Sequence, residues 1–121
     1  MRRFVIEMGQ GVDLHGSDMT KAARRGVEDA LRHASFPLFP ALGIDRAAMR
    51  VRVTVAVPDP DAVDVAAVAA LLPYGDVAVE AVAGGLSSTN PDDGEVTTVA
   101  AVAVEAFLPE ALARGAVAER A

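Results

Sequence analysis

One short stretch of the chain, residues 8–20, concentrates the side chains that could do chemistry. Asp13 and His15 stand two residues apart, so in an extended segment both side chains point the same way. Such a pair could relay a proton or share a divalent metal ion. The alternative is that Asp13 binds loop amides and His15 satisfies backbone groups. We predict that Asp13 and His15 carry chemistry at a glycine loop between a strand and a helix.

A metal site at this loop needs more ligands than these two. The other histidine, His33, lies roughly 22 Å along the helix predicted after the loop, at the α-helical rise per residue. Glu7, Asp18 or a neighbouring chain would have to complete the coordination. The sequence specifies no cofactor, and a divalent metal ion on Asp13 and His15 is one hypothesis.

The same stretch carries donors for an anion. Lys21 is the sole lysine beside ten arginines. It falls in the first turn of the predicted helix, where free amides and the helix dipole favour anions. Ser17 and Thr20 add hydroxyl donors. Three glycines would allow tight turns and close approach of a ligand: Gly9, Gly11 and Gly16. We predict that the loop binds a carboxylate or an oxyanion with Lys21 as a catalytic residue, a solvated Lys21 being the alternative.

Two arginines form a second candidate site. Arg50 and Arg52 lie on one face of a predicted strand and could clamp a carboxylate of a ligand. The alternative is that they pair across strands with Glu7, Glu80 or Glu105.

Hydrophobic periodicity supplies the elements that position these residues. The predicted strands cover residues 4–8, 49–57, 77–83 and 97–107, and the predicted helices cover residues 19–34 and 65–72. The first strand stops at Gly9, Ser17 or Asp18 caps the first helix, and residues 58–61 cap the second. The connection over residues 84–94 is longer than a tight hairpin.

This order predicts a single domain over residues 1–121 with an α/β (α+β) two-layer sandwich fold. The element order is strand, helix, strand, helix, strand, strand, in a mixed sheet with both helices on one face. The first helix has a stripe of alanine and glycine, so it should lie close against the sheet. Residues 109–121 form an alanine-rich tail that is either helical or frayed.

The opposite face of the predicted sheet is too apolar for free exposure and too charged for a dry core. We expect it to carry Val5, Glu7, Arg50, Arg52, Glu80 or Val82, and the valines and alanines of the last strand. We therefore predict a homo-oligomer, a trimer or a multiple of three, with the loop site at a subunit interface.

Composition excludes several classes of protein. The net charge is −6 with scattered basic residues, which argues against binding of nucleic acid. Cysteine is absent, so disulfides and thiolate chemistry are excluded. No apolar run reaches the roughly 20 residues that cross a bilayer. The mean hydropathy is +0.31. Because no membrane-spanning run is present, we expect a cytoplasmic protein whose partner is a small molecule and not a membrane.

The stretch Gly9-Gln10-Gly11-Val12-Asp13-Leu14-His15-Gly16 resembles a small family of conserved hypothetical proteins with a GxGxDxHG signature near the N-terminus. The resemblance extends over nearly the whole chain. It includes residues 3–9, Thr20-Lys21-Ala22-Ala23, Pro73-Tyr74-Gly75 and Gly84-Gly85-Leu86. The family implies no settled activity.

Two looser resemblances add expectations. The order of elements and Gly84-Gly85-Leu86 are similar to the trimeric chorismate-mutase-like fold, which implies sites between subunits where Arg50 or Arg52 binds a carboxylate. Residues 11–15 are similar to the start of methylerythritol cyclodiphosphate synthases, which implies a divalent metal on Asp13 and His15. The further histidine and the later acidic motif of that family are missing here.

Together these features predict a small oligomeric enzyme that acts on an anionic or carbonyl metabolite at the loop over residues 9–21. His15 would exchange a proton, Asp13 would orient it or share a metal, and Lys21 with loop amides would hold the anion. The alternative is a non-catalytic oligomer that binds a metabolite or a metal at the same loop.

Overall fold

The computed structural model describes residues 1–32, 46–72 and 75–111. In chain order the elements are β1 (Arg2–Asp13), α1 (Met19–Arg32), η3 (Arg46–Ala48), β2 (Arg50–Val57), η4 (Pro60–Ala62), α2 (Val65–Ala69), β3 (Asp76–Ala83), β4 (Leu86–Thr89) and β5 (Val96–Leu108), where η marks a 3₁₀ turn. His33, Tyr74 and most of the predicted tail lie outside the described residues. Within those residues, no helix is long and apolar enough to cross a membrane.

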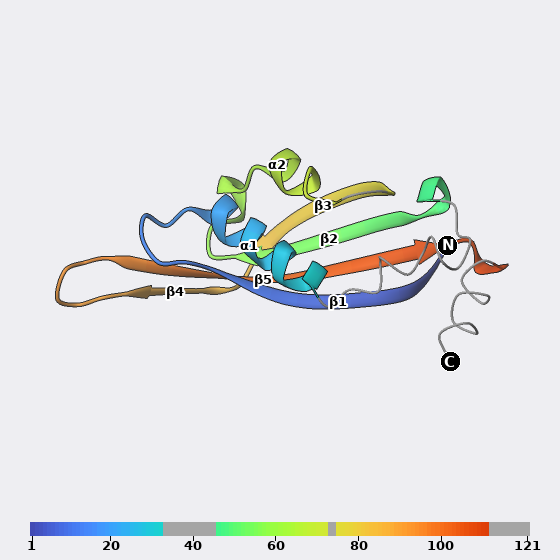
Figure 1. The fold of residues 1–121 in the computed structure, drawn as a ribbon. Helices are drawn as coiled ribbons and strands as arrows, with labels where there is room; N and C mark the ends of the chain where they lie inside the picture. The colour runs from blue at the N-terminus through green and yellow to red at the C-terminus, as the bar shows by residue number, and fades with distance from the viewer. Residues whose placement is uncertain (33–45, 73–74, 112–121) are drawn as a thin grey trace.

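The strands form one mixed sheet with β5 in its interior (Figure 1). The order is β1-β5-β2-β3, and β4 pairs with the first residues of β5. β5 is antiparallel to β1, β2 and β4, whereas β2 and β3 are parallel. The predicted mixed sheet of an α+β sandwich is confirmed, with β4 as an unpredicted fifth strand inside the connection over residues 84–94.

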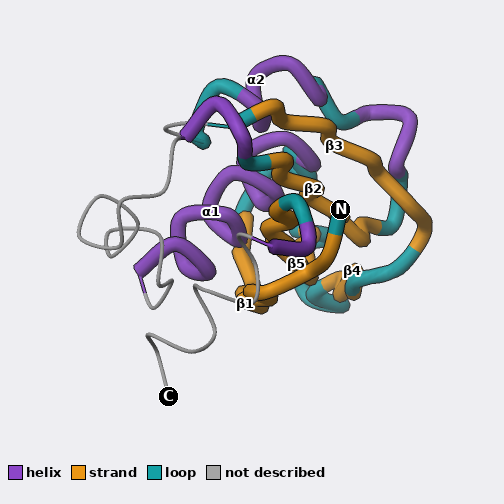
Figure 2. The backbone as a smooth tube through the Cα atoms, turned by 90° about the vertical axis from the view of Figure 1, so that its right-hand side faces the viewer, coloured by secondary structure: helices purple, strands orange, loops and turns teal. Residues whose placement is uncertain are grey.

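Both helices lie on one side of the sheet, which Figure 2 shows in a view along the strands. Period-2 alternation puts Val51, Val53, Val55 and Val57 of β2 in the core beneath them. On β5 the core residues are Ala100, Val102, Val104, Ala106 and Leu108. The layer of side chains between sheet and helices is therefore built mainly from valine and alanine.

β1 is longer than predicted, because it does not stop at Gly9. Its pairing with β5 continues through Gly9–Val102 and Gly11–Ala100 to Asp13–Thr98. The prediction of a glycine loop beginning at Gly9 is therefore wrong, and the connection to α1 covers residues 14–18 only.

The two glycines of β1 allow α1 to approach the strand. A Cβ atom at Gly11 would overlap the carbonyl oxygen of Ala22 and the amide nitrogen of Gly26. A Cβ atom at Gly9 would lie 2.5 Å from the carbonyl oxygen of Gly26. Backbone thus packs directly on backbone, which confirms that the alanine and glycine stripe of this helix lies close against the sheet.

The parity of these glycines decides which residues of β1 face the helices. Val5 lies four residues before Gly9 on the same side of β1, and it is buried at 5% exposure. Glu7, between them on that side, is partly buried. Ile6 and Met8 point to the opposite side and are exposed. The expectation that Val5 and Glu7 occupy the open face is wrong, because the positions that α1 covers are the odd-numbered ones.

α2 is shorter than predicted and begins at a different cap. It covers only five residues, and the Asp64 side chain accepts a hydrogen bond from the Ala67 amide at 3.2 Å. η4 occupies the predicted capping segment. After β3, β4 and the first residues of β5 form an arm that extends beyond the helices (Figure 1).

Candidate functional site

Asp13 is fully buried at the end of β1 and is held by two partners. The Asp18 amide donates to its Oδ2 at 2.8 Å, and the Lys21 ammonium lies 3.2 Å from its Oδ1. The hydrogen bond from the Asp18 amide lowers the pKa of Asp13. Burial opposes that shift, and Lys21 adds to the lowering. Asp13 is therefore an ionised carboxylate that closes the turn into α1.

Asp18 caps α1, in agreement with one of the two predicted caps. Its Oδ1 accepts a hydrogen bond from the Lys21 amide at 3.0 Å. Gly16 and Ser17 turn the chain before it with φ of +94° and +52°. Ser17 is exposed, and its side chain does not serve as the cap.

Thr20 connects α1 to the segment before α2. Its Oγ1 accepts from the Asp64 amide at 2.9 Å and donates to the Ala62 carbonyl at 3.4 Å. Thr20 was predicted as a ligand donor, and the structure places its hydroxyl between two backbone groups of the chain.

His15 lies on the surface and contacts the arm, whereas Asp13 is buried. Its side chain is 74% exposed, and Nδ1 lies in hydrogen-bonding contact with Oε2 of Glu95, just before β5. A carboxylate on Nδ1 orients the ring and leaves Nε2 for another partner. The structure thus separates Asp13 from His15 and pairs His15 with a residue that the sequence did not single out.

The antiparallel register contains the signal that would have found Glu95. Because Asp13 is paired with Thr98, the residues after Asp13 continue alongside those before Thr98. The Thr97 hydroxyl accordingly donates to the Leu14 carbonyl at 3.4 Å. Knowledge of this pairing would have placed His15 opposite Val96, next to Glu95, but the pairing itself is not visible in the periodicity.

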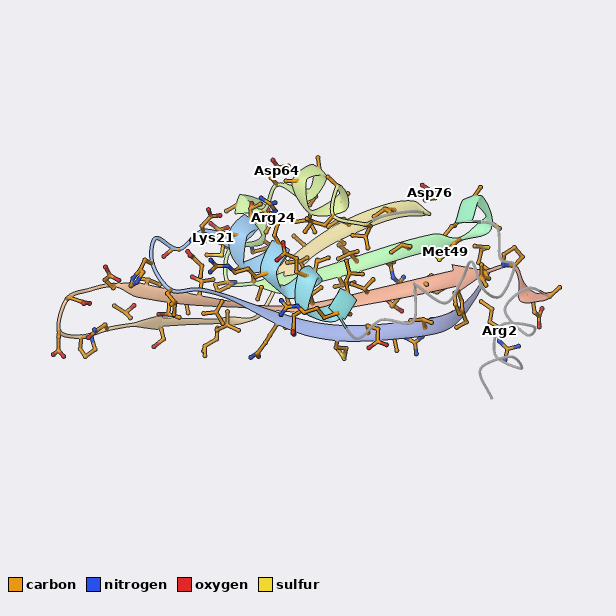
Figure 3. All side chains as sticks on the ribbon, viewed as in Figure 1. Arg2, Lys21, Arg24, Met49, Asp64 and Asp76 are labelled. Carbon is orange, nitrogen blue, oxygen red and sulfur yellow. The ribbon has the colours of Figure 1, made fainter. Side chains whose placement is uncertain are left out.

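A shallow hollow of about 170 Å³ lies on the outer surface of α1. Its lining has three cations and one acid: Lys21, Arg24, Arg25 and Glu28. Figure 3 shows Lys21 and Arg24 on the half of α1 nearer the loop. Arg25 also donates to the Val12 carbonyl at 2.6 Å, which fixes it against the outer edge of β1. Residues spaced three and four apart on one helix face thus form a cationic surface beside the loop.

Arg50 and Arg52 lie elsewhere, on the face of the sheet opposite the helices. Arg52 binds Glu105 through Nε at 3.1 Å and Nη2 at 3.3 Å, and its guanidinium lies 5.4 Å from the centroid of the Phe107 ring. Arg3 binds the same carboxylate at 3.1 Å. This is the cross-strand pairing considered as the alternative for Arg52. Along β5 it lies about 23 Å from the Asp13 pairing, so these arginines do not join the loop.

Glu105 is the second carboxylate with a shifted pKa. The hydrogen bonds from Arg52 lower its pKa most, burial acts in the opposite direction, and Arg3 lowers it further. Its side chain is only 9% exposed, so both arginines neutralise a charge that the sheet nearly encloses.

The residues that were considered as metal ligands do not gather. Within residues 1–32, 46–72 and 75–111, no three histidine or acidic side chains lie close enough to hold a metal ion. Glu7 precedes Asp13 by six residues on the same strand, a separation of about 20 Å. Asp18 uses one of its carboxylate oxygens as the cap of α1.

Comparison with known proteins assigns the chain to a family. Residues 3–106 match the model of the conserved hypothetical protein family Lin0512_fam. The chain belongs to this family. An FtsZ-like protein of unknown function from Nostoc punctiforme PCC 73102 has a similar crystal structure, with TM-score 0.79 and 32% sequence identity. The similarity covers 90% of this chain and 97% of that protein. No curated protein matches the chain. Membership in Lin0512_fam thus establishes relatedness and assigns no reaction.

Proposed function

We propose that this member of Lin0512_fam is a small enzyme that acts on an anionic or carbonyl metabolite, with His15 as the residue that exchanges a proton. The contact between His15 and Glu95 carries the proposal. A histidine whose Nδ1 is held by a carboxylate presents Nε2 in a defined orientation, as general bases in many enzymes do. The high exposure of His15 leaves Nε2 accessible to a substrate from solvent.

The cationic hollow supplies the second half of the proposal. Lys21, Arg24 and Arg25 outnumber the single acid Glu28, so the hollow favours a carboxylate or phosphate group. Lys21 is half-exposed while its ammonium contacts the buried Asp13. In this proposal Asp13 positions Lys21 and the turn, Lys21 holds the anion, and only His15 transfers a proton.

The proposal is tested with pyruvate, a small molecule with both a carbonyl and a carboxylate. Exchange of its methyl protons for deuterium in D₂O, followed by proton NMR, reports proton abstraction directly. We expect the wild-type protein to accelerate the exchange and His15→Gln to lower the rate by about 100-fold or more. Glu95→Gln should lower it by about tenfold, since orienting partners contribute less than the base.

The control is Arg50→Gln, which lies on the opposite face of the sheet and should leave the rate unchanged. Undiminished exchange by His15→Gln would contradict the assignment of the base. The same measurement repeated with other 2-oxo acids and 3-oxo acids tests the range of carbonyl substrates.

The non-catalytic alternative has an observation of its own in favour. Asp13 is bound to the Asp18 amide and to Lys21, which is the arrangement of a structural turn. In this second candidate function the hollow binds an anion without proton transfer. Titration with inorganic phosphate would then give saturable NMR chemical-shift changes at the α1 amides, and His15→Gln would keep them. These changes, together with no deuterium exchange of pyruvate by the wild type, would favour this alternative.

A further inference from the structure

The face of the sheet opposite the helices carries exposed apolar side chains. Among the described residues six large apolar side chains are exposed, and three of them lie on this face: Ile6 at 42%, Met8 at 68% and Leu86 at 60%. Leu86 is on this side because it pairs with Val99, which in turn pairs with Val12. Exposed patches of this kind mark interaction sites when they are contiguous.

The register makes the patch continuous along β5, where Val99, Ala101 and Ala103 line the face. On β1, Met8 and Val12 lie on the same face with the exposed Gln10 between them. β5 has 13 residues, so the stripe is about 43 Å long, and three strands make it about 14 Å wide. We name this surface, with Phe107 at its far end, the apolar stripe. The whole face along β5, with the polar residues on it included, covers about 600 Å², so two copies would bury about 1,200 Å², the lower end for specific protein interfaces.

Charge on this face is confined to one end of the apolar stripe and to its side. Glu105 binds both Arg52 and Arg3 beside Phe107, so its carboxylate is neutralised and the three side chains together keep one positive charge. The opposite end, at Val12, Val99 and Leu86, carries no ionisable residue in these pairings.

A two-fold rotation about the middle of the apolar stripe therefore places apolar residues on apolar residues. It also sends the two Arg–Glu clusters to opposite ends, where they do not repel one another. A second copy of the same face can thus cover the apolar residues while the excess arginine charge stays at the ends of the contact, where Arg3 and Arg52 are about half-exposed.

We propose that the apolar stripe packs face to face against the apolar stripe of a second copy of this chain. Of the oligomers predicted from the sequence, a trimer has no two-fold axis, so this contact fits a larger multiple of three, such as a hexamer. Self-association through this face does not depend on turnover at His15, so failure of either proposal leaves the other standing.

The first test compares two substitutions at positions of equal exposure. Ile6 on the apolar stripe and Val65 on α2 are both 42% exposed. We expect the wild-type protein to self-associate in sedimentation equilibrium at micromolar concentrations. Ile6→Glu should weaken association by about 100-fold, because it puts a second carboxylate directly opposite Glu105, its cross-strand partner, within the contact. Val65→Glu should associate like the wild type.

Circular dichroism of both variants verifies that the fold is intact. A monomeric wild-type protein, or equal association of Ile6→Glu and Val65→Glu, would overturn the proposal.

The absence of cysteine from the chain allows a second test that does not depend on weakening the interface. Met8→Cys introduces a single thiol on the apolar stripe, and Val65→Cys introduces one on the helix side. Treatment with a short thiol-reactive cross-linker should give a covalent dimer with Met8→Cys only. Cross-linking of Val65→Cys instead would contradict face-to-face packing. So would a monomeric Met8→Cys protein whose thiol does not react with maleimide, because the same chain would then cover the apolar stripe.

Discussion

The two halves of the GxGxDxHG stretch have opposite environments. Residues 9–13 belong to β1, and their odd positions are covered by α1: Gly9 and Gly11 contact helix backbone, and Asp13 is fully buried. Residues 14–18 leave the sheet and are exposed, with His15 directed to Glu95. The stretch that resembles one site in the sequence therefore has two parts. Residues 9–13 pack against α1, and we call them the packing seam; residues 14–18 form a surface loop.

The difference shows that strand parity decides the role of a residue more strongly than its chemical type does. Asp13 and Gly11 share a face, so the helix that needs the glycine also buries the carboxylate. His15 lies beyond the last β1 pair and escapes this constraint. The packing seam should therefore respond to substitution through stability, and the loop through chemistry.

The largest expected effect is at Gly11. Gly11→Ala should lower the free energy of unfolding by about 3 kcal/mol or more, because the new methyl group overlaps backbone atoms of Ala22 and Gly26 that cannot rotate away. Gly16→Ala is the matched control, since nothing lies within 4 Å of a Cβ atom there and only its φ of +94° is unfavourable. We expect it to cost about 1 kcal/mol in urea unfolding. Equal losses of unfolding free energy in Gly11→Ala and Gly16→Ala would contradict the distinction between the packing seam and the surface loop.

The next effect is at Asp13. Asp13→Ala should cost about 2 to 3 kcal/mol, because it leaves the Asp18 amide and the Lys21 ammonium without their carboxylate. Asp93→Ala is a suitable comparison, because Asp93 also accepts from a backbone amide, that of Glu95 at 2.9 Å, but is exposed. We expect a loss below about 1 kcal/mol there. A harmless Asp13→Ala would mean that the carboxylate does not close the turn.

The pH dependence of stability should also separate the two halves. Because the pKa of Asp13 is lowered in the folded chain, its contribution is present above the unfolded pKa of about 4 and is lost as the pH falls through the folded pKa. Glu105 contributes with the same sign. Urea unfolding of Asp13→Asn should therefore show a smaller loss of stability between pH 5 and acid than the wild type does. An unchanged slope would contradict the lowered pKa of Asp13.

The smallest effect on stability is expected at His15. His15→Gln should change the free energy of unfolding by less than about 0.5 kcal/mol, since the side chain is exposed and its pairing with Glu95 is solvated. The same variant should lose the proton exchange proposed above. A large destabilisation would make the His15–Glu95 contact a structural one.

Local patterns predicted much of the fold. Alternation on β2 and the three-and-four spacing on α1 placed those elements within a few residues of their observed bounds, and Asp18 was one of the two predicted caps. The extension of β1 to Asp13 was missed because Gly9 and Gly11 are weak strand formers by themselves. They are held in the strand by pairing with β5, from a part of the chain about 90 residues away.

The candidate site was less predictable for the same reason. His15 and Lys21 were identified by type, but Glu95 is brought to His15 only by the register of β1 and β5. The cationic hollow depends on the side of α1 that remains exposed after the seam has formed. Contacts that arise from long-range pairing leave no local signal in a single sequence.

The pKa of Asp13 is the most direct test of the division between seam and loop. Carbon-detected NMR of the labelled carboxyl group over a pH series measures it in the intact wild-type protein. The structure predicts a value clearly below the ordinary range of an aspartate, because the Asp18 amide and Lys21 stabilise the ionised form. A value at or above that range would contradict this account, and a value raised toward neutral pH would return Asp13 to the chemistry beside His15.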